Sequence, residues 1–254
     1  MTLPKTPSFR LDGKRALIAG ASRGIGLGAA VALAEQGAQI VCVARGREQL
    51  DQAVGELISA GFDAQAATLD LADSDAIKTT VAELGPFDVV VNSAGIARHA
   101  PALETALDDY QAVMDINVRG AFVLSAEAGR GMIAAGKPGS IIHISSQMGH
   151  VGGIDRAVYC ASKHALEGMI KAMAIEWGKS GVRINTVCPT FIKTPLTEAT
   201  FADPQKVGWI TSKIKLDRIG KIEDIMGAVV YLAGDASALV TGTSLLIDGG
   251  WTAG

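Results

Sequence analysis

The sequence predicts an α/β fold in which about seven parallel strands form one doubly wound sheet with helices on both faces. Short runs rich in β-branched residues alternate with alanine-rich helical stretches from residue 14 to the end of the chain. This alternation is typical of a parallel sheet covered on both sides. No stretch of the 254 residues has the composition of a linker, so we expect a single domain over residues 1–254.

Short β-branched runs indicate the strands, which we expect at Arg15–Ala19, Gln39–Val43, Asp63–Thr68, Phe87–Asn92, Ser140–Ser145, Arg183–Val187 and Ser244–Ile247. The gaps between them predict the helices, several with apolar residues three and four apart, at Gly26–Gln36, Arg47–Ala60, Ser74–Leu84, Leu107–Ala135, Ala157–Lys179 and Ile222–Gly234.

Two segments, residues 96–105 and 189–218, lack a strong period. In open α/β sheets, ligands bind outside the carboxyl ends of the strands, and both segments follow such ends. We therefore expect both to be loops that contact the substrate.

The composition excludes several classes of function. The net charge of -3 comes from 23 basic and 26 acidic residues that are scattered along the chain, which argues against nucleic acid or an anionic membrane as a partner. The chain has no apolar run long enough for a membrane span or a signal peptide, so we expect a cytoplasmic protein. The expected partner is a small molecule.

The cysteines and histidines show no metal-binding spacing. The three cysteines are an odd number without a C-x-x-C pair, which favours reduced thiols. The four histidines, at positions 99, 143, 150 and 164, form no zinc motif with each other or with cysteine. We expect no catalytic metal.

A glycine-rich turn follows the first expected strand and opens into a helix, with the run Gly20-Ala21-Ser22-Arg23-Gly24-Ile25-Gly26. Backbone amides at a helix N-terminus attract negative charge, and glycines let a phosphate approach the backbone closely. A turn of this kind at the first strand-to-helix junction predicts a Rossmann-type dinucleotide site.

Tyr159 and Lys163 lie one helical turn apart, so their side chains project from one face of the expected helix. A phenol starts from a pKa near 10, and a neighbouring cation favours its phenolate form. Ser146 lies thirteen residues before the tyrosine, at the end of an expected strand, and Ser145 is its competitor. Because side chains alternate along a strand, we expect the two serines to face in different directions.

These features together resemble the short-chain dehydrogenase/reductase family over essentially the whole chain. The motifs that carry the resemblance are the G-x-x-x-G-x-G spacing, Asn92-Ser-Ala94-Gly95, Asn117, Ser146, Tyr159-x-x-x-Lys163, Asp70, Pro189 through Thr194, and the Ile247-Asp-Gly-Gly ending. Two positions depart from the family pattern: Ser93 stands where a second asparagine is usual, and Thr190 stands where glycine is usual.

The resemblance implies a catalytic group made of Asn117, Ser146, Tyr159 and Lys163. Hydride transfer to a carbonyl builds negative charge on oxygen and requires a proton donor, which by resemblance is Tyr159. Ser146 would hydrogen-bond the substrate oxygen, Lys163 would also reach the nicotinamide ribose, and Asn117 would hold a water next to Lys163.

The resemblance also implies where the cofactor lies. Asp70 would bond the adenine with Leu71 beside it. The remaining contacts would come from the ends of later strands, namely Asn92, Ala94 and Gly95 on the ribose side, and Pro189, Ile192 and Thr194 near the carboxamide.

The end of the second strand indicates NADP(H). An acid there would bind the ribose hydroxyls and repel a 2′-phosphate, but the run Val43-Ala44-Arg45-Gly46-Arg47 contains none. Arg45 offers a planar fork suited to a phosphate, and Arg23 approaches from the glycine loop. The alternative is an enzyme that prefers NAD(H).

The substrate is left open among carbonyl compounds and alcohols. Loop residues that are candidates for contacting it are Arg98, His99, Gln147, Met148, His150 and Ile154. Parts of the sequence resemble family members that act on sugar acids and polyols, and the general outline equally resembles 3-oxoacyl thioester reductases. A protein that binds NADP(H) without catalysis is a further alternative. By resemblance we expect a homotetramer, with a dimer as the other possibility.

Overall fold

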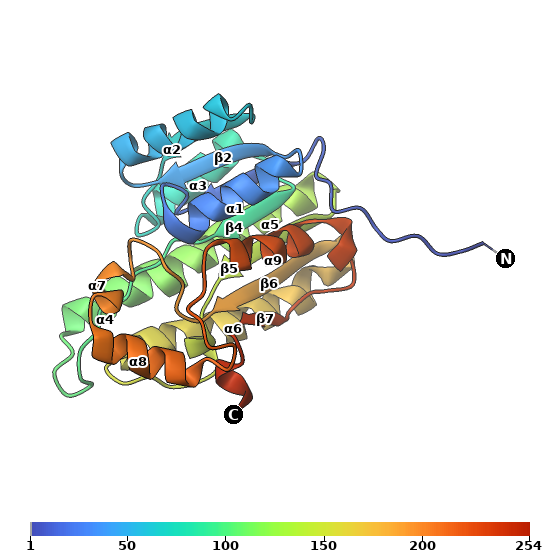
Figure 1. Ribbon diagram of the computed structural model, residues 1–254. Coiled ribbons are helices and arrows are strands. Elements are labelled where there is room, and N and C mark those ends of the chain that lie inside the picture. The colour runs from blue at the N-terminus through green and yellow to red at the C-terminus, as the bar shows by residue number, and fades with distance from the viewer. Residues whose placement is uncertain (1) are drawn as a thin grey trace.

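The computed structural model describes residues 2–254, which form a seven-stranded sheet with all strands parallel (Figure 1). The strand order is β3-β2-β1-β4-β5-β6-β7. The strands are β1 (Arg15–Ala19), β2 (Gln39–Ala44), β3 (Ala64–Thr68), β4 (Val89–Asn92), β5 (Gly139–Ile144), β6 (Val182–Pro189) and β7 (Ser244–Ile247). All seven predicted strands are present, with ends shifted by at most two residues.

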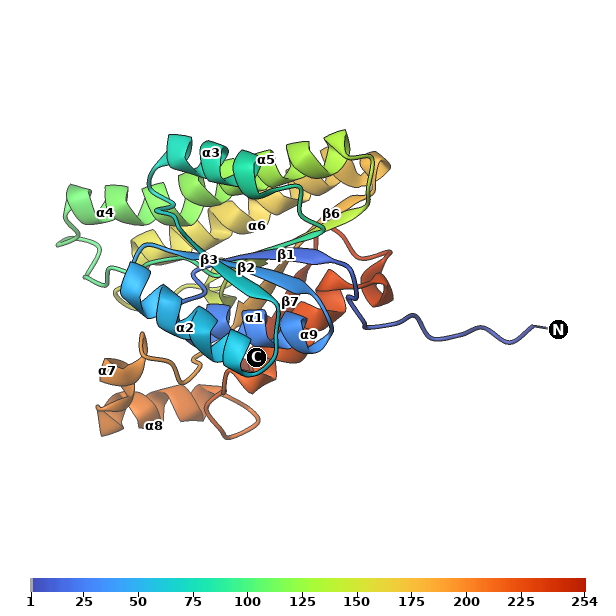
Figure 2. The same ribbon diagram turned by 90° about the horizontal axis from the view of Figure 1, so that it is seen from above.

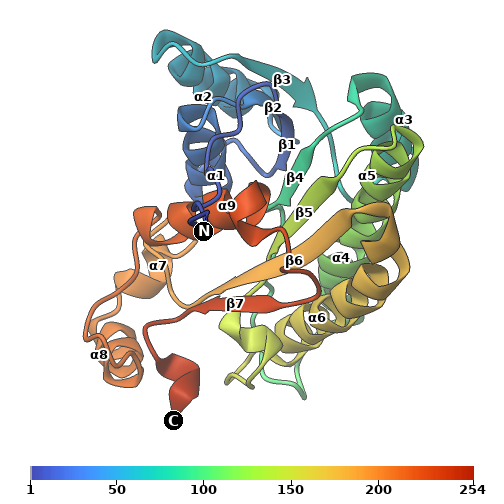
Figure 3. The ribbon, with the colours of Figure 1, turned by 90° about the vertical axis from the view of Figure 1, so that its right-hand side faces the viewer.

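Helices cover both faces of the sheet, as Figures 2 and 3 show. On one face lie α1 (Gly24–Glu35), α2 (Arg47–Ser59) and α9 (Glu223–Ala233); on the other lie α3 (Ser74–Leu84), α5 (Ala121–Ala134) and α6 (Ala157–Trp177). A hydrophobic core lies on each face of the sheet. Side chains of each central strand point alternately into the two cores, since Ile18 of β1 packs with the first set of helices and its neighbour Leu17 packs with the second. Burial of both faces explains why these strands are continuous apolar runs.

The predicted helix Leu107–Ala135 is interrupted. It consists of α4 (Leu107–Met114), one π-helical segment, η1 (Asp115–Gly120), and α5. A Cβ at Gly120 would lie 2.3 Å from the Leu71 carbonyl oxygen, so the chain here packs against the segment after β3. The π-helical turn contains Asn117, and such turns are frequent at functional sites.

The second aperiodic segment is not a loop throughout. Residues 189–218 include α7 (Glu198–Phe201) and α8 (Pro204–Lys213). Asp203 caps α8 by accepting hydrogen bonds from the amides of Gln205 and Lys206, and Pro204 occupies the first turn. Only Ile210 of α8 is buried, which explains why the sequence carries no clear apolar period there.

A buried polar network joins β4, β5 and α5. His143 is fully buried, with Nδ1 3.3 Å from Asn92 Nδ2 and Nε2 2.8 Å from Ser125 Oγ. Asn92 in turn accepts a hydrogen bond from the Ala94 amide at 3.1 Å, so the network shapes the turn after β4. Burial, together with the charge of Lys163, lowers the pKa of His143 to about 3. The imidazole is therefore neutral in the folded protein.

We predict that His143 makes the protein acid-sensitive. Because the folded pKa lies below the unfolded value of about 6.5, the unfolded chain binds an extra proton as the pH falls below about 6.5. Stability is retained above that pH and lost below it, by about 2 kcal/mol between pH 6.5 and 5. Urea unfolding at both pH values measures the loss, and His143→Gln should remove most of it. The exposed His164→Gln is the matched control, and an unchanged pH dependence in His143→Gln would contradict the assignment.

Candidate active site

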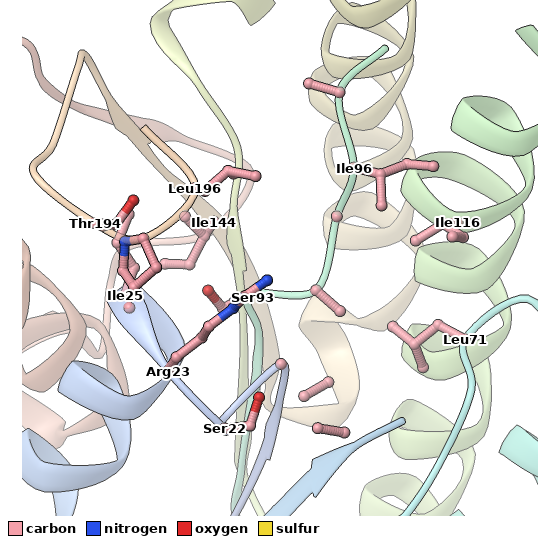
Figure 4. A pocket seen from close by; sticks show the side chains of 18 of the residues that line it. Ser22, Arg23, Ile25, Leu71, Ser93, Ile96, Ile116, Ile144, Thr194 and Leu196 are labelled. Atoms are coloured by element: carbon pink, nitrogen blue, oxygen red, sulfur yellow. The ribbon is translucent and has the colours of Figure 1, made fainter. Parts of the chain in front are cut away.

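A cavity of 620 Å³ opens at the carboxyl edge of the sheet, where β1 and β4 lie side by side (Figure 4). The chain leaves β1 toward β2 on one side and leaves β4 toward β5 on the other, so the loops after these two strands diverge. Ligands bind at such switch points in doubly wound sheets. In Figure 4, Arg23 and Ile25 lie on one side of the cavity, and Leu71 and Ile116 lie on the other.

The glycine loop forms the side of the cavity next to α1. Gly20 has a φ of +78°, and a Cβ on it would lie 2.8 Å from the Ala94 amide nitrogen. A Cβ on Gly26 would lie 2.1 Å from the Gly20 carbonyl oxygen, so only glycine lets α1 start this close to β1. The first turn of α1 has no acid and no side-chain cap. Its amides are therefore available to an anion.

Most of the residues predicted for the cofactor line this cavity, namely Gly20, Ser22, Arg23, Gly24, Ile25, Arg45, Asp70, Leu71, Ala94, Gly95, Tyr159, Lys163, Pro189, Ile192 and Thr194. Two predicted residues lie behind its surface. Gly26 packs against the loop, and Asn92 supports the Ala94 turn from below. Gln49, Ile116 and Leu196 line the cavity although no sequence motif marked them.

The β2 end of the cavity is basic. Arg45 and Arg23 are exposed, and Asp70 is the one acid among the cavity-lining residues of the described chain. Asp70 accepts a hydrogen bond from the Ala72 amide at 2.9 Å. The next arginine, Arg47, is committed to an ion pair with Asp51 at 2.6 Å.

Helix α6 brings Tyr159 and Lys163 to the floor of the cavity. The Lys163 side chain is buried, and its Nζ donates to the Ile144 carbonyl oxygen at 3.0 Å. The same Nζ lies 5.7 Å from the centroid of the Tyr159 ring. Within residues 2–254, no carboxylate lies within ion-pair distance of Lys163. The predicted pairing of a phenol with a cation on one helical face is therefore present.

Asn117 joins the loop after β4 to α6. Its carboxamide Oδ1 accepts from the Ile96 amide and its Nδ2 donates to the Ile96 carbonyl, both at 2.9 Å. Nδ2 also donates to Ser162 Oγ at 3.1 Å, and Ser162 donates to the Tyr159 carbonyl at 2.8 Å. Ser162 is fully buried, and no sequence pattern had marked it.

Ser145 and Ser146 both line the cavity at the end of β5. Ser146 Oγ accepts a hydrogen bond from the Met148 amide at 3.1 Å, which leaves its own hydroxyl hydrogen free to donate. Thr190, a departure from the family pattern, also lines the cavity. Its Oγ1 is buried and has no hydrogen-bond partner among residues 2–254.

The candidate substrate residues lie in different surroundings. Arg98 forms a surface ion pair with Asp109 at 3.0 Å, and Ile154 is 77% exposed. Met148 is buried, and a Cβ on Gly153 would lie 2.9 Å from its sulfur.

Gln147 is also buried, and both its amide nitrogen and its amide oxygen lack a partner in the described chain.

His150 lies in a side-chain group with Glu167 and Cys188, which are far apart in sequence and form no motif. Its Nε2 lies 3.5 Å from Cys188 Sγ and 4.0 Å from a carboxylate oxygen of the buried Glu167. Burial and the nearby Glu167 raise the pKa of the Cys188 thiol to about 12, so the thiol is protonated and donates to Glu167.

His99 lies beside Tyr159, with ring centroids 6.2 Å apart and the rings edge to face. Its Nε2 is 2.8 Å from a guanidinium nitrogen of Arg156. No sequence motif marks Arg156, although its position three residues before Tyr159 was a usable signal. Its guanidinium also lies 5.4 Å from the centroid of the Phe191 ring.

No helix described between residues 2 and 254 is long and apolar enough to cross a membrane.

Known proteins resemble this chain over nearly its whole length. The family model described as enoyl-(acyl carrier protein) reductase matches residues 20–252. D-erythrulose reductase from Gallus gallus is 37% identical over 245 residues, which cover 96% of this chain and 98% of that one. Gluconate 5-dehydrogenase from Gluconobacter oxydans is 38% identical over 248 residues, which cover 96% of each chain.

A solved structure shares the fold closely. The crystal structure of a gluconate 5-dehydrogenase from Burkholderia cenocepacia, in complex with NADP and tartrate, has a TM-score of 0.92 and 37% identity, and the match covers 97% of this chain and 98% of that one. These matches agree with the glycine spacing and with the order of Asn117, Ser146, Tyr159 and Lys163 along the chain. The chain therefore belongs to the short-chain dehydrogenase/reductase family.

Proposed function

We propose that this protein is an NADP(H)-dependent oxidoreductase that interconverts the ketone of a sugar derivative and the corresponding secondary alcohol. The observation that carries the proposal is the buried Lys163 ammonium 5.7 Å from the Tyr159 ring, at the floor of a cavity that extends to the glycine loop. A proton donor and an anion-binding turn thus share one cavity.

The residues around the cavity fit a dinucleotide. The first turn of α1 offers amides to a pyrophosphate, and the glycine contacts leave no side chain in the way. The unpartnered Thr190 Oγ1 lies near the predicted carboxamide end, where a ligand would supply its hydrogen bond. When bound, the reduced nicotinamide supplies the hydride.

Tyr159 donates the proton in the reductive direction. Its Oη–H bond breaks as the carbonyl oxygen takes the proton and the carbonyl carbon accepts the hydride, which leaves an alcohol and a phenolate. The ammonium of Lys163 favours that phenolate electrostatically, and the Ile144 carbonyl fixes its position. In the oxidative direction the phenolate accepts the alcohol proton.

Ser146 and Asn117 have different parts in this proposal. The free hydroxyl hydrogen of Ser146 donates to the substrate oxygen as charge develops on it. The carboxamide of Asn117 forms hydrogen bonds with Ile96 and Ser162. Asn117 therefore acts as a positioning residue that holds the loop after β4 against α6. A water next to Lys163 would then bond to the backbone of the π-helical turn rather than to this carboxamide.

We predict that Tyr159→Phe lowers kcat at least about 100-fold, since general acid catalysis contributes about 10²–10⁴-fold. Because the phenol is not needed to hold the nucleotide phosphates, the Kd for NADPH should change less than about threefold. NADPH oxidation and NADPH fluorescence titration measure the two effects. Retention of activity in a folded variant would remove Tyr159 from the mechanism, and undetectable wild-type turnover with tight NADPH binding would favour the non-catalytic alternative.

The proposed preference for NADP(H) over NAD(H) depends on the residues at the carboxyl end of β2. Arg45 and Arg23 are exposed cations without an ion-pair partner in residues 2–254, and no acid from β2 faces them in the cavity. The guanidinium fork of Arg45 suits a phosphate. A 2′-phosphate would therefore be favoured over a ribose hydroxyl.

We predict that Arg45→Gln raises the KM for NADPH about tenfold and that Arg45→Asp raises it about 100-fold, since one charge-assisted hydrogen bond is worth about 1.5–3 kcal/mol. The KM for NADH should fall or stay constant. Arg47→Gln is the matched control, because Arg47 lies two residues away and is paired with Asp51. Equal effects of the two glutamine variants would refute the assignment.

The names of the relatives support a sugar derivative as the proposed substrate class. One is named for a neutral ketose, erythrulose, and another for a sugar acid, gluconate. Polyhydroxy substrates fit a site whose polar groups include Ser145, Ser146 and Thr190. A 3-oxoacyl thioester remains the alternative to test beside them.

We propose a homotetramer, supported by apolar side chains on the outer helices and the edge strand. Phe122 of α5 is 50% exposed, Ile175 of α6 is 83% exposed, and Leu246 of β7 is 40% exposed. Exposed apolar groups of this kind often lie between subunits.

We predict a light-scattering mass four times the chain mass of 26.2 kDa at micromolar concentration, because association would bury these side chains. A dimer would leave one of the apolar surfaces uncovered, and a monomer would contradict the proposal. Phe122→Glu should lower the measured mass.

A further inference from the structure

Arg156 is a half-buried cation without an acidic partner. It lies at the N-cap of α6, three residues before Tyr159. Burial lowers the pKa of the Arg156 guanidinium, and the nearby Tyr159, Cys160 and Asp155 oppose this shift. No acid lies within 4.0 Å of it in the part of the chain that the structure describes, and the neighbouring Asp155 acts on it only through space. A charge in this state is costly unless a ligand pairs with it.

Two contacts hold the Arg156 side chain in place, and a backbone hydrogen bond holds the turn that carries it. The guanidinium lies 5.4 Å from the centroid of the Phe191 ring, and a Cβ on Gly153 would come within 2.9 Å of its Cδ, so the side chain passes directly over that glycine. Asp155 has a φ of +58°, and its carbonyl accepts from the Ala100 amide at 3.2 Å, which ties this turn to the loop after β4. The position of the cation is therefore set before any ligand binds.

His99 adds a second donor. A guanidinium has no acceptor, so Arg156 donates to His99 Nε2 across the 2.8 Å contact. Burial and the charge of Arg156 lower the pKa of His99, so the ring is neutral at pH 7 and carries its proton on Nδ1. That N–H makes no hydrogen bond within residues 2–254. Among residues 2–254, protein atoms accept from one of the five N–H donors of Arg156.

These donors lie next to the reacting group, since the His99 ring packs edge to face against Tyr159 with centroids 6.2 Å apart. A substrate whose carbonyl lies at Tyr159 meets these donors when its other end lies on the His99 side of the Tyr159 ring.

We propose that Arg156, with His99, binds a carboxylate of the substrate, so that the protein acts on keto sugar acids and their hydroxy acids in preference to neutral ketoses and polyols. This inference rests on the proposed oxidoreductase function and names which of its two substrate groups is preferred. A carboxylate accepts two parallel hydrogen bonds from one guanidinium, a geometry that a hydroxymethyl group does not match. A phosphate dianion would leave one charge unpaired, because His99 is neutral.

The test compares two substrates that differ at one group. Wild-type enzyme and NADPH are assayed with a keto-aldonate and with the ketohexose that carries CH2OH in place of the carboxylate. We expect kcat/KM to be at least tenfold higher for the acid, and Arg156→Met to lower it about 10–100-fold for the acid, mainly through KM. The neutral ketose should change less than about threefold. Arg130→Met is the matched control, because it removes an exposed charge from α5.

Each outcome separates the inference from the function on which it rests. Turnover of both compounds with equal loss in Arg156→Met, or a preference for a ketose phosphate, overturns the carboxylate site and keeps the oxidoreductase. If neither compound reacts, calorimetric binding of gluconate to the wild-type protein with NADP decides. Gluconate binding that Arg156→Met weakens at least tenfold supports the site, and no binding overturns it. Arg156→Lys, which keeps the charge without the fork, should restore only part of the affinity.

Discussion

Lys163 is a buried ammonium whose hydrogen bond within the described chain goes to a backbone carbonyl, and much of the site is arranged around it. An unpaired buried charge is expensive, so the surrounding groups must either supply dipoles or stay neutral. The Ile144 carbonyl supplies the dipole at 3.0 Å, and it fixes α6 against the end of β5. His143, which precedes Ile144 in β5, stays neutral because it is buried and because Lys163 is charged. Tyr159 lies where the same charge favours a phenolate.

Four cations lie in or beside the cavity, and we propose a different task for each group of them. Arg23 and Arg45 lie exposed at the end where a phosphate would bind, Lys163 lies buried at the centre, and Arg156 lies half-buried beyond Tyr159. The solvent exposure of each cation fits the role proposed for it. Exposed cations attract a charged ligand at little cost, whereas a buried one acts only on what is placed beside it.

Periodicity and turn chemistry predicted the sheet because most strands are short apolar runs of ordinary length, and the family motifs located Tyr159, Lys163 and the glycine loop. The π-helical turn at Asn117 was not predictable, because a one-residue expansion hardly changes the apolar pattern of the helix. Helix α8 was missed because its one buried side chain leaves no stripe to read. Arg156 was missed because the sequence does not show that its guanidinium forms no ion pair within residues 2–254, even with Asp155 beside it; its closeness to Tyr159 in sequence was the one available signal.

The attachment of α8 has a consequence for how specificity evolves in this architecture. Ile210 is its one buried residue, and Trp209 makes an edge contact with Trp251, with ring centroids 5.3 Å apart. The segment is therefore added to the sheet rather than built into its core. Its shape can change at small cost in folding, whereas Arg156, the residue proposed to bind an acid, starts the helix that carries Tyr159 and Lys163. Under that proposal, changes in α8 are separate from changes in the recognition of substrate charge, and selection can alter one without disturbing the other.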